Sequence, residues 1–186
     1  SAARRGTLVV VAVGNGGPQP LTLDTPADAD SALAIGASDS LGRVATFSSR
    51  GPTADGRIKP DLIAPGQAVT IAATASGITQ GNGTSFATPL VAGLAALVQG
   101  ARAGRPAVEL RQGLFGAGSF ALAPDNNHGW GIPDAFKLYA FPSGVTPLGV
   151  SSAALETVTP SFAWDAGTPI SGTGPHLFRL KVGADT

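Results

Sequence analysis

Short apolar runs, each ended by a turn rich in Gly, Pro or Asp, dominate the first half of the chain. Four such runs predict strands at 7–13, 32–37, 62–64 and 69–75. The first run is continuous and rich in β-branched residues, which is typical of a strand buried on both faces of a parallel sheet. It stops abruptly at a Gly-rich turn, GNGGP over 14–18, so the chain opens with a buried strand.

Helical spacing replaces the strand pattern after residue 84. A helix over 85–98, buried almost all round, is predicted because apolar residues recur every three or four positions with few polar ones between: Leu90, Leu94, Leu97 and Val98. Pro106 opens a second, more amphipathic helix that stops at Gly116 and Gly118. We therefore expect an α/β fold, with a mainly parallel sheet and helices on both faces.

A domain boundary is predicted after Phe141, where the chain turns to Pro142-Ser143-Gly144. Beyond it, apolar residues alternate with polar ones, as in half-buried antiparallel strands: Phe162, Trp164, Phe178, Leu180 and Val182. Residues 1–141 thus form one domain, and 142–186 a linker and an incomplete β-sandwich-like module.

Composition excludes several classes of partner. The 12 basic and 12 acidic side chains balance, and no basic cluster exceeds Arg4-Arg5, so the chain offers nothing to a nucleic-acid backbone. The most apolar stretch, 90–98, is far short of the roughly 20 residues of a membrane span, so no membrane partner is expected. The chain has no Cys, which removes disulfides, zinc thiolates and thiol nucleophiles. The run before Gly14 lacks a cleavage site and is a strand, not a signal peptide.

Ser85 is the first candidate for chemistry. It follows a Gly-rich turn and stands in the first turn of the predicted helix, where the helix dipole stabilises a developing anion. A nucleophile fits this position. The commoner meaning of Thr84 or Ser85 at such a place is a helix cap, so position alone leaves both interpretations open.

A longer pattern favours the nucleophile. This stretch resembles, over residues 83–93 (GTSFATPLVAG), the nucleophile signature of the subtilisin-like serine proteases. Further segments resemble the same family in the same order: 9–16 (VVVAVGNG), 31–38 (SALAIGAS), 45–52 (ATFSSRGP), 59–66 (KPDLIAPG) and 129–135 (GWGIPDA). The resemblance covers about residues 1–140 and implies a secreted or cell-envelope serine endopeptidase acting on protein or peptide substrates.

The resemblance also assigns roles to residues of the first strand. Asn15 corresponds to the family's oxyanion-hole Asn, which acts together with the backbone N–H of the nucleophile. Taken alone, Asn15-Gly16 is only a strong turn signal. Ala12, Val13 and Gly14 would line one wall of the pocket for the substrate residue that precedes the cut. Loop 16–30, which no motif constrains, would contribute to its rim.

No general base accompanies these residues. A Ser hydroxyl needs a His oriented by a carboxylate, and in this family both stand N-terminal to the oxyanion Asn. The two His of the chain, His128 and His176, lie in a predicted surface turn and in the tail, and neither is expected to act. We therefore expect this chain to be the C-terminal part of a catalytic domain, inactive without the missing N-terminal half.

Two alternatives remain open. An α/β-hydrolase would use Ser85, Asp134 and His176 in that order, but its nucleophile directly follows a strand, whereas a flexible loop over 77–83 is expected here. The other alternative is a truncated or split scaffold that binds without turnover.

No cofactor is expected from the motifs in the chain. The segment 24–30 carries Asp24, Asp28 and Asp30, and oxygen ligands close in sequence suit Ca²⁺. It lacks the Gly and terminal Glu of an EF-hand loop, so we assign no metal and leave a structural calcium as an alternative. No phosphate-binding loop pattern is present around Ser85.

Overall fold

The computed structural model describes residues 5–72, 77–102 and 104–140. These residues belong to the first of two compact units, Ser1–Val150 and Ser151–Thr186. The predicted boundary after Phe141 and the predicted module of 142–186 lie outside the described residues.

Three parallel strands form the central sheet in the order β1-β2-β3: β1 Val9–Ala12, β2 Ala32–Ser38 and β3 Leu62–Pro65. Val10 pairs with Leu33, and Ile35 pairs with Leu62. All seven residues of β2 are buried, as expected for the central strand. The prediction that the first strand is buried on both faces is wrong, because β1 lies at the edge of the described sheet and its residues are half-buried.

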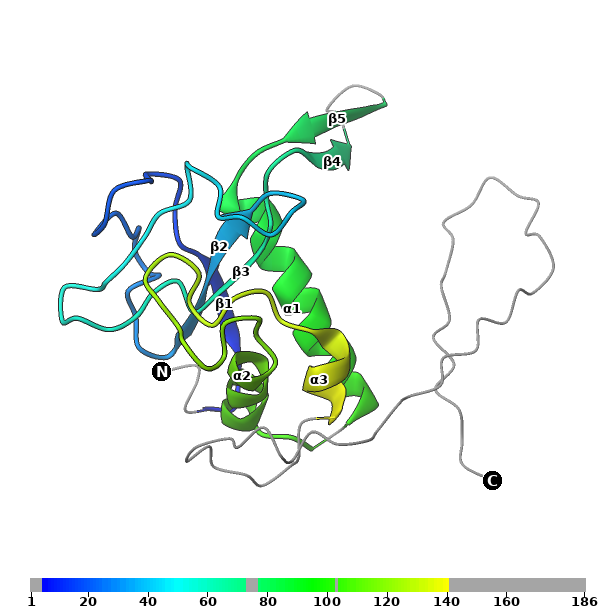
Figure 1. The fold of residues 1–186 in the computed structure, drawn as a ribbon. Helices are drawn as coiled ribbons and strands as arrows, with labels where there is room; N and C mark the ends of the chain where they lie inside the picture. Colours follow the sequence, from blue (N-terminus) through cyan, green and yellow to red (C-terminus); the bar gives the residue numbers. More distant parts are fainter. Residues whose placement is uncertain (1–4, 73–76, 103, 141–186) are drawn as a thin grey trace. The chain divides into compact units, whose positions relative to one another are not determined.

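A two-stranded antiparallel hairpin precedes the longest helix. It consists of β4 Val69–Ala72 and β5 Ile78–Gly81, with Ile71 paired to Thr79, and it projects from the rest of the fold (Figure 1). The predicted loop over 77–83 is therefore wrong for residues 78–81, which form a strand. The apolar pattern missed β5 because three of its four residues are exposed.

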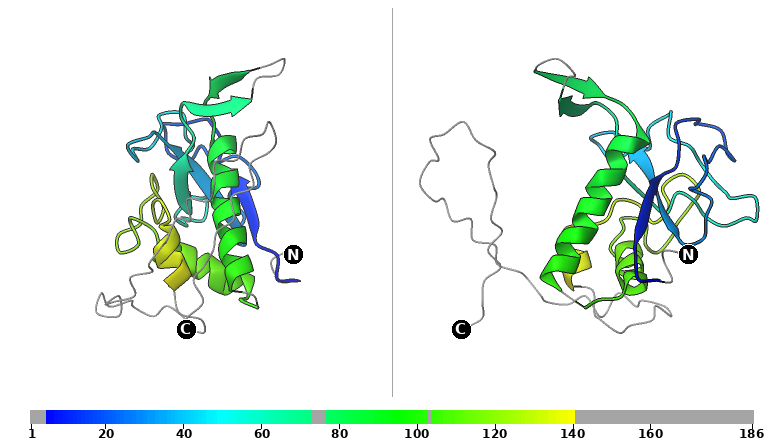
Figure 2. Two further views of the ribbon diagram at one scale, coloured as in Figure 1. Left: turned by 90° about the vertical axis from the view of Figure 1, so that its right-hand side faces the viewer. Right: turned by 180° about the vertical axis from the view of Figure 1, so that it is seen from behind.

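Three helices follow: α1 Thr84–Ala101, α2 Ala107–Gly116 and α3 Ala135–Ala140. Helix α1 contacts all three parallel strands and runs along the sheet in both views of Figure 2. Its buried residues recur at helical spacing and form one face: Thr84, Ala87, Val91, Ala95 and Val98. The prediction that this helix is buried almost all round is wrong, since Leu90 and Leu97 are 51% and 68% exposed.

The main core lies between α1 and the sheet. Leu33 and Ile35 of β2 are fully buried there, each contributing about 1.5–3 kcal/mol to folding, and all three helices share this cluster. A smaller cluster on Ala34, which points to the other face, joins Val13 to Ala27. Helix α1 is also long and apolar enough to cross a membrane by length and composition, and in this fold it is a helix of the core.

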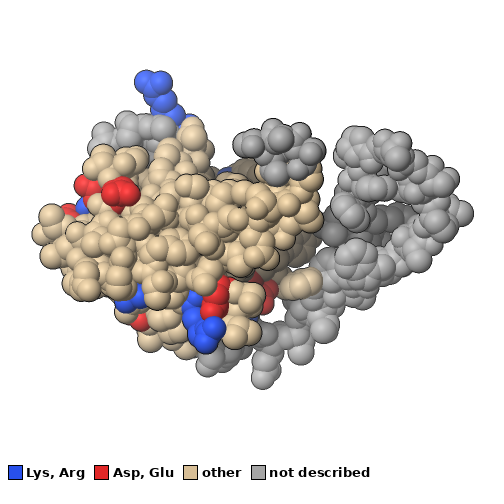
Figure 3. Space-filling model, turned by 90° about the horizontal axis from the view of Figure 1, so that it is seen from above, with Lys and Arg blue, Asp and Glu red and all other residues tan. Residues whose placement is uncertain are grey.

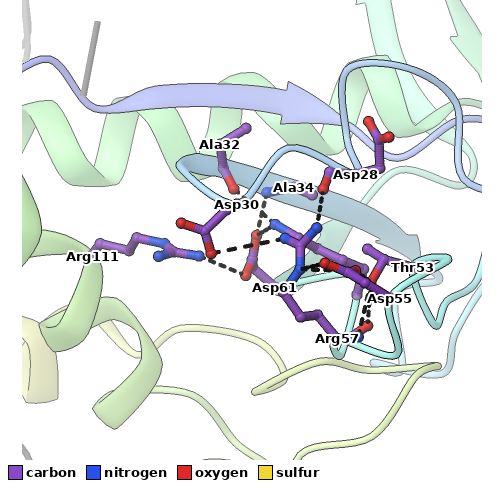
Figure 4. A network of polar contacts seen from close by, with 10 residues as sticks. Asp28, Asp30, Ala32, Ala34, Thr53, Asp55, Arg57, Asp61 and Arg111 are labelled. Atoms are coloured by element: carbon purple, nitrogen blue, oxygen red, sulfur yellow. Dashed lines mark hydrogen bonds and ion pairs between the residues drawn. The ribbon is translucent and has the colours of Figure 1, made fainter. Parts of the chain in front are cut away.

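A buried ion network ties the start of β2 to α2. Lys59 Nζ lies 2.5 Å from Asp61 Oδ2 and donates to the carbonyl of Ala32, and both charged side chains are 2% exposed. Asp61 also accepts from the N–H of Ala34 at 2.7 Å and from Arg111 of α2 at 3.3 Å (Figure 4). Burial lowers the pKa of Lys59, while the adjacent carboxylate acts in the opposite direction.

Candidate active site

The turn after β1 holds Asn15 in a fixed position. Gly14 has φ of +105°, a left-handed value that favours glycine, and this bend carries the chain away from the strand. Ser49, which is fully buried, hydrogen-bonds the backbone on both sides of Asn15. Its N–H donates to the carbonyl of Gly14, and its hydroxyl accepts from the N–H of Gly16, each at 3.0 Å.

The carboxamide of Asn15 faces the start of α1. Its Oδ1 accepts two hydrogen bonds from Thr84, one from the backbone N–H at 2.9 Å and one from the hydroxyl at 3.1 Å. The Thr84 hydroxyl also lies 3.3 Å from the carbonyl of Gly14. With Oδ1 held by two donors, the amide NH₂ of Asn15 points away from Thr84 and stays available to another acceptor.

Ser85 is the second residue of α1, and its side chain is exposed. The N-cap is Gly83, and no side chain caps the helix, so neither Thr84 nor Ser85 is the cap that its position suggested. The hydroxyl of Ser85 makes no hydrogen bond to any residue that the structure describes. Its N–H is one of the helix N-terminal donors without an intrahelical partner.

This arrangement can stabilise negative charge. The structure brings Asn15 and the start of α1 together, although 69 positions separate Asn15 from Thr84. The free NH₂ of Asn15, the N–H of Ser85 and the positive end of α1 lie in one neighbourhood, next to an exposed hydroxyl. An oxygen atom placed there would meet hydrogen-bond donors fixed before it arrives.

Ala12, Val13 and Gly14 lead directly into this neighbourhood. Ala12 is half-buried, whereas Val13 and Gly14 are buried. The carbonyl of Val13 accepts from the N–H of Asp24, so loop 16–30 returns along this segment. Loop 16–30 therefore lies beside the segment that leads to Asn15.

The described His is engaged elsewhere. His128 Nδ1 lies 3.0 Å from Asp125 Oδ2, and the imidazole stacks on Phe120 with the ring centroids 4.3 Å apart. It has no contact with Ser85. His176 lies outside the described residues, so its lack of a catalytic role stays a prediction.

The acidic loop, which suggested Ca²⁺, is partly neutralised by Arg57. The guanidinium of Arg57 donates to the carbonyl of Asp28 at 2.8 Å and lies 3.9 Å from Asp30 (Figure 4). The same Arg57, with Thr53, holds the pKa of Asp55 at about 2.

Within residues 5–72, 77–102 and 104–140, no three His, Asp or Glu side chains gather as metal ligands would. The face seen from above is mostly uncharged, with charged side chains towards its margins (Figure 3).

Comparison with known proteins decides the family. The model of the subtilase family matches residues 1–131. The chain belongs to the subtilase family. Over 137 residues it is 38% identical to subtilisin BL of Lederbergia lenta, a match that covers 73% of this chain and 47% of that protein. The serine protease AprX of Bacillus subtilis (strain 168) is 37% identical over 114 residues, covering 50% and 26%.

Solved structures agree with this assignment. The prenylagaramide maturation protease PagA superposes with a TM-score of 0.63 and 28% identity, covering 76% of this chain and 52% of that one. The α/β subtilisin-like fold expected from the sequence is thereby confirmed. This subtilase chain spans about half the length, or less, of the relatives that it matches. The α/β-hydrolase alternative loses its basis, since the strand before Ser85 is β5, which pairs with β4 and not with the central sheet.

The hydrogen bonds of two residues around Asn15 do not follow from the sequence. Thr84 stands inside the nucleophile signature and hydrogen-bonds Asn15 itself. Ser49 stands in the family-like segment 45–52 and hydrogen-bonds the backbone of Gly14 and Gly16 on either side of Asn15. The signal available for both was only their place in those motifs. Their hydrogen bonds join segments far apart in the chain, which no local pattern reveals.

Proposed function

We propose that this subtilase is a serine endopeptidase in which Ser85 is the nucleophile and Asn15 supplies the oxyanion hole. One observation carries the proposal: the double hydrogen bond from Thr84 to Asn15 Oδ1, which turns the amide NH₂ away from Thr84 beside the first turn of the helix that bears Ser85. Membership of a protease family implies that the substrates are proteins or peptides.

The reaction would pass through an acyl-enzyme. Ser85 Oγ attacks the scissile carbonyl carbon, and the carbonyl oxygen becomes an oxyanion that accepts from Asn15 Nδ2 and from the N–H of Ser85. A general base takes the proton of the Ser85 hydroxyl during the attack and gives it to the leaving nitrogen. The tetrahedral intermediate then collapses, releases the amine half of the substrate and leaves an ester on Ser85. Water then attacks the ester and frees the acid half.

The general base and its orienting carboxylate would come from outside residues 1–186. His128, the only His among the described residues, is paired with Asp125 and stacked on Phe120. The hydroxyl of Ser85 has no hydrogen-bonding partner in the described part of the chain. The match covers only about half of each of these relatives, which leaves room for a segment that supplies both groups. This segment would be the N-terminal half of the catalytic domain, and residues 1–186 would have to pack against it to form an active enzyme.

The pocket for the residue preceding the cut would use Ala12, Val13 and Gly14 as one wall. We propose no cofactor in the chemistry, since the nucleophile and the oxyanion donors come from the protein itself.

The proposed location is outside the cytoplasm, either secreted or in the cell envelope. Fractionation of the producing cells, with detection of this chain by mass spectrometry, checks that location.

Active-site labelling tests the proposal. The complete protein, carrying the N-terminal half, is treated with a fluorophosphonate, and the modified peptide is identified by mass spectrometry. Modification of Ser85 in preference to Ser48 and Ser49, abolished in Ser85→Ala, is the expected result. Purified residues 1–186 alone should neither label nor cleave casein or peptide amides.

The same experiment distinguishes a protease from the alternative function, a scaffold that binds peptides without turnover. A complete protein that folds, binds peptides and leaves Ser85 unlabelled would be such a scaffold. Turnover by residues 1–186 alone that disappears in Ser85→Ala would instead overturn the assignment of the base to a missing segment.

A further inference from the structure

The carboxylate of Asp24 lies against the α-carbon of Gly14. A Cβ atom added at Gly14 would fall 2.6 Å from Asp24 Cγ and 2.9 Å from Ser49 Oγ, so no larger residue fits there without a shift. Gly14 belongs to the wall that we assign to the pocket, and it directly precedes Asn15. A negative charge therefore stands on that wall, one residue away from the proposed oxyanion donor.

The backbone holds Asp24 in this place. Its N–H donates to the carbonyl of Val13 at 2.9 Å, and its carbonyl accepts from the N–H of Ala27 at 2.8 Å. The preceding residue, Leu23, packs against the small cluster that contains Val13 and Ala27.

No cation of the described part of the chain pairs with Asp24. Two other acidic residues differ in this respect, because Asp30 faces Arg57 and Asp55 forms a 2.8 Å ion pair with it. Arg50, the basic residue that follows Ser49, does not bind Asp24 through its Nε, because this atom is buried without a hydrogen-bond partner. Asp24 itself is exposed, so a ligand entering along the wall can reach the carboxylate.

We infer that Asp24 determines specificity: its carboxylate accepts the ammonium or guanidinium of the substrate residue preceding the cut, so the protease prefers Lys or Arg there. This inference rests on the proposed function and names the substrate class of the same site. A carboxylate on a pocket wall gains strength as the substrate expels water from it, and Arg can bind it through two parallel hydrogen bonds. A neutral side chain in the same place would leave that charge without a partner, and this difference produces the selectivity.

The test compares substrates of equal shape and different charge. The complete protein is assayed on peptide amides with Lys or its neutral analogue norleucine, and with Arg or its neutral analogue citrulline, before the scissile bond. We expect kcat/KM to favour the charged member of each pair by on the order of 10- to 100-fold. In Asp24→Asn this ratio should fall to within about threefold of unity, because only the charged substrates lose a partner.

The matched control is Asp28→Asn, a neutral substitution of an exposed carboxylate in the same loop. It should keep the wild-type ratio, since the contact of Asp28 with Arg57 uses its backbone carbonyl. A wild-type ratio near unity overturns the inference. So does an Asp24→Asn protein that loses all four substrates equally, which would mark Asp24 as a structural residue only.

The labelling of Ser85 distinguishes failure of this inference from failure of the proposed function. Cleavage of the norleucine peptide with labelled Ser85, but without preference for Lys, overturns the role of Asp24 and leaves the peptidase intact. A complete, folded protein that neither labels nor cleaves overturns both.

Discussion

The amide oxygen of Asn15 accepts from both the N–H and the hydroxyl of Thr84, at 2.9 and 3.1 Å. These two contacts connect the turn after β1 to the first residue of α1, and Thr84 is fully buried. The orientation of the Asn15 amide is thus fixed by the helix that carries Ser85. A substrate oxygen would meet a donor that needs no rearrangement.

Substitutions at Asn15 and Thr84 should slow turnover in the complete protein without weakening substrate binding. A subtilisin is the precedent for loss of an oxyanion-hole Asn, at about 10²–10³ in kcat, and Asn15→Ala should follow it. Thr84→Val removes one of the two donors and should lower kcat on the order of 10-fold. Steady-state kinetics measures both effects.

Thr84→Ser is the matched control, since it keeps the hydroxyl. It should restore most of the turnover lost in Thr84→Val. A rise in KM with unchanged kcat in Asn15→Ala would contradict the oxyanion role, because the amide is engaged mainly in the transition state.

The tail should be dispensable for catalysis. His176→Ala, or deletion of the residues after Phe141, should leave peptidase turnover of the complete enzyme within a few-fold of wild type. A general base lost at His176 would reduce turnover more than loss of an oxyanion donor, because an unactivated Ser barely attacks an amide. Collapse of activity in a folded His176→Ala protein, with Asn15→Ala nearly silent, would refute the assignment.

The buried pair Lys59 and Asp61 should respond strongly to removal of one partner. Asp61→Ala leaves Lys59 buried without its carboxylate and also removes the acceptor of the Ala34 N–H, so we expect a loss of about 3–5 kcal/mol in the free energy of unfolding. The double variant Lys59→Met/Asp61→Leu should recover part of that loss. Urea unfolding measures both, and equal losses in the two proteins would argue against an uncompensated charge.

The loop around Asp125 should lose stability in acid. Burial raises the pKa of the Asp125 carboxyl, but the N–H groups of Asn127 and His128 and the ring of His128 outweigh it, so the pKa lies below the ordinary 3.8. A lowered pKa in the folded state means that this group stabilises the fold above its unfolded pKa. That contribution disappears as pH falls through the folded value.

The measurement compares thermal unfolding of wild type and Asp125→Asn over a range of pH. Wild type should be the more stable protein near neutral pH, and the gap should narrow below about pH 4. A gap that stays constant into strong acid would contradict the assignment of this effect to the Asp125 carboxylate.

Apolar periodicity predicted the elements that have a buried face and failed where burial depends on neighbours. The runs at 32–37 and 62–64 correspond closely to β2 and β3, and the helix over 85–98 lies within α1. Strand β5 escaped prediction because its residues are mostly exposed and its partner β4 alone makes it a strand. The exposed side of α1, with Leu90 and Leu97, shows that an apolar residue reports a tendency to be buried and not the presence of a partner.

By itself, the sequence determined the family, the α/β class and the two segments that carry Asn15 and Ser85, because each depends on residues close together in the chain. Tertiary structure decided how the Asn15 amide is oriented and that Thr84 donates hydrogen bonds to it instead of capping the helix. It also decided that the Asp24 carboxylate lies against Gly14. Those contacts join residues 10 to 69 positions apart. They arise only when the turn after β1, its returning loop and the start of α1 are packed against one sheet, where backbone geometry and excluded volume fix each side chain.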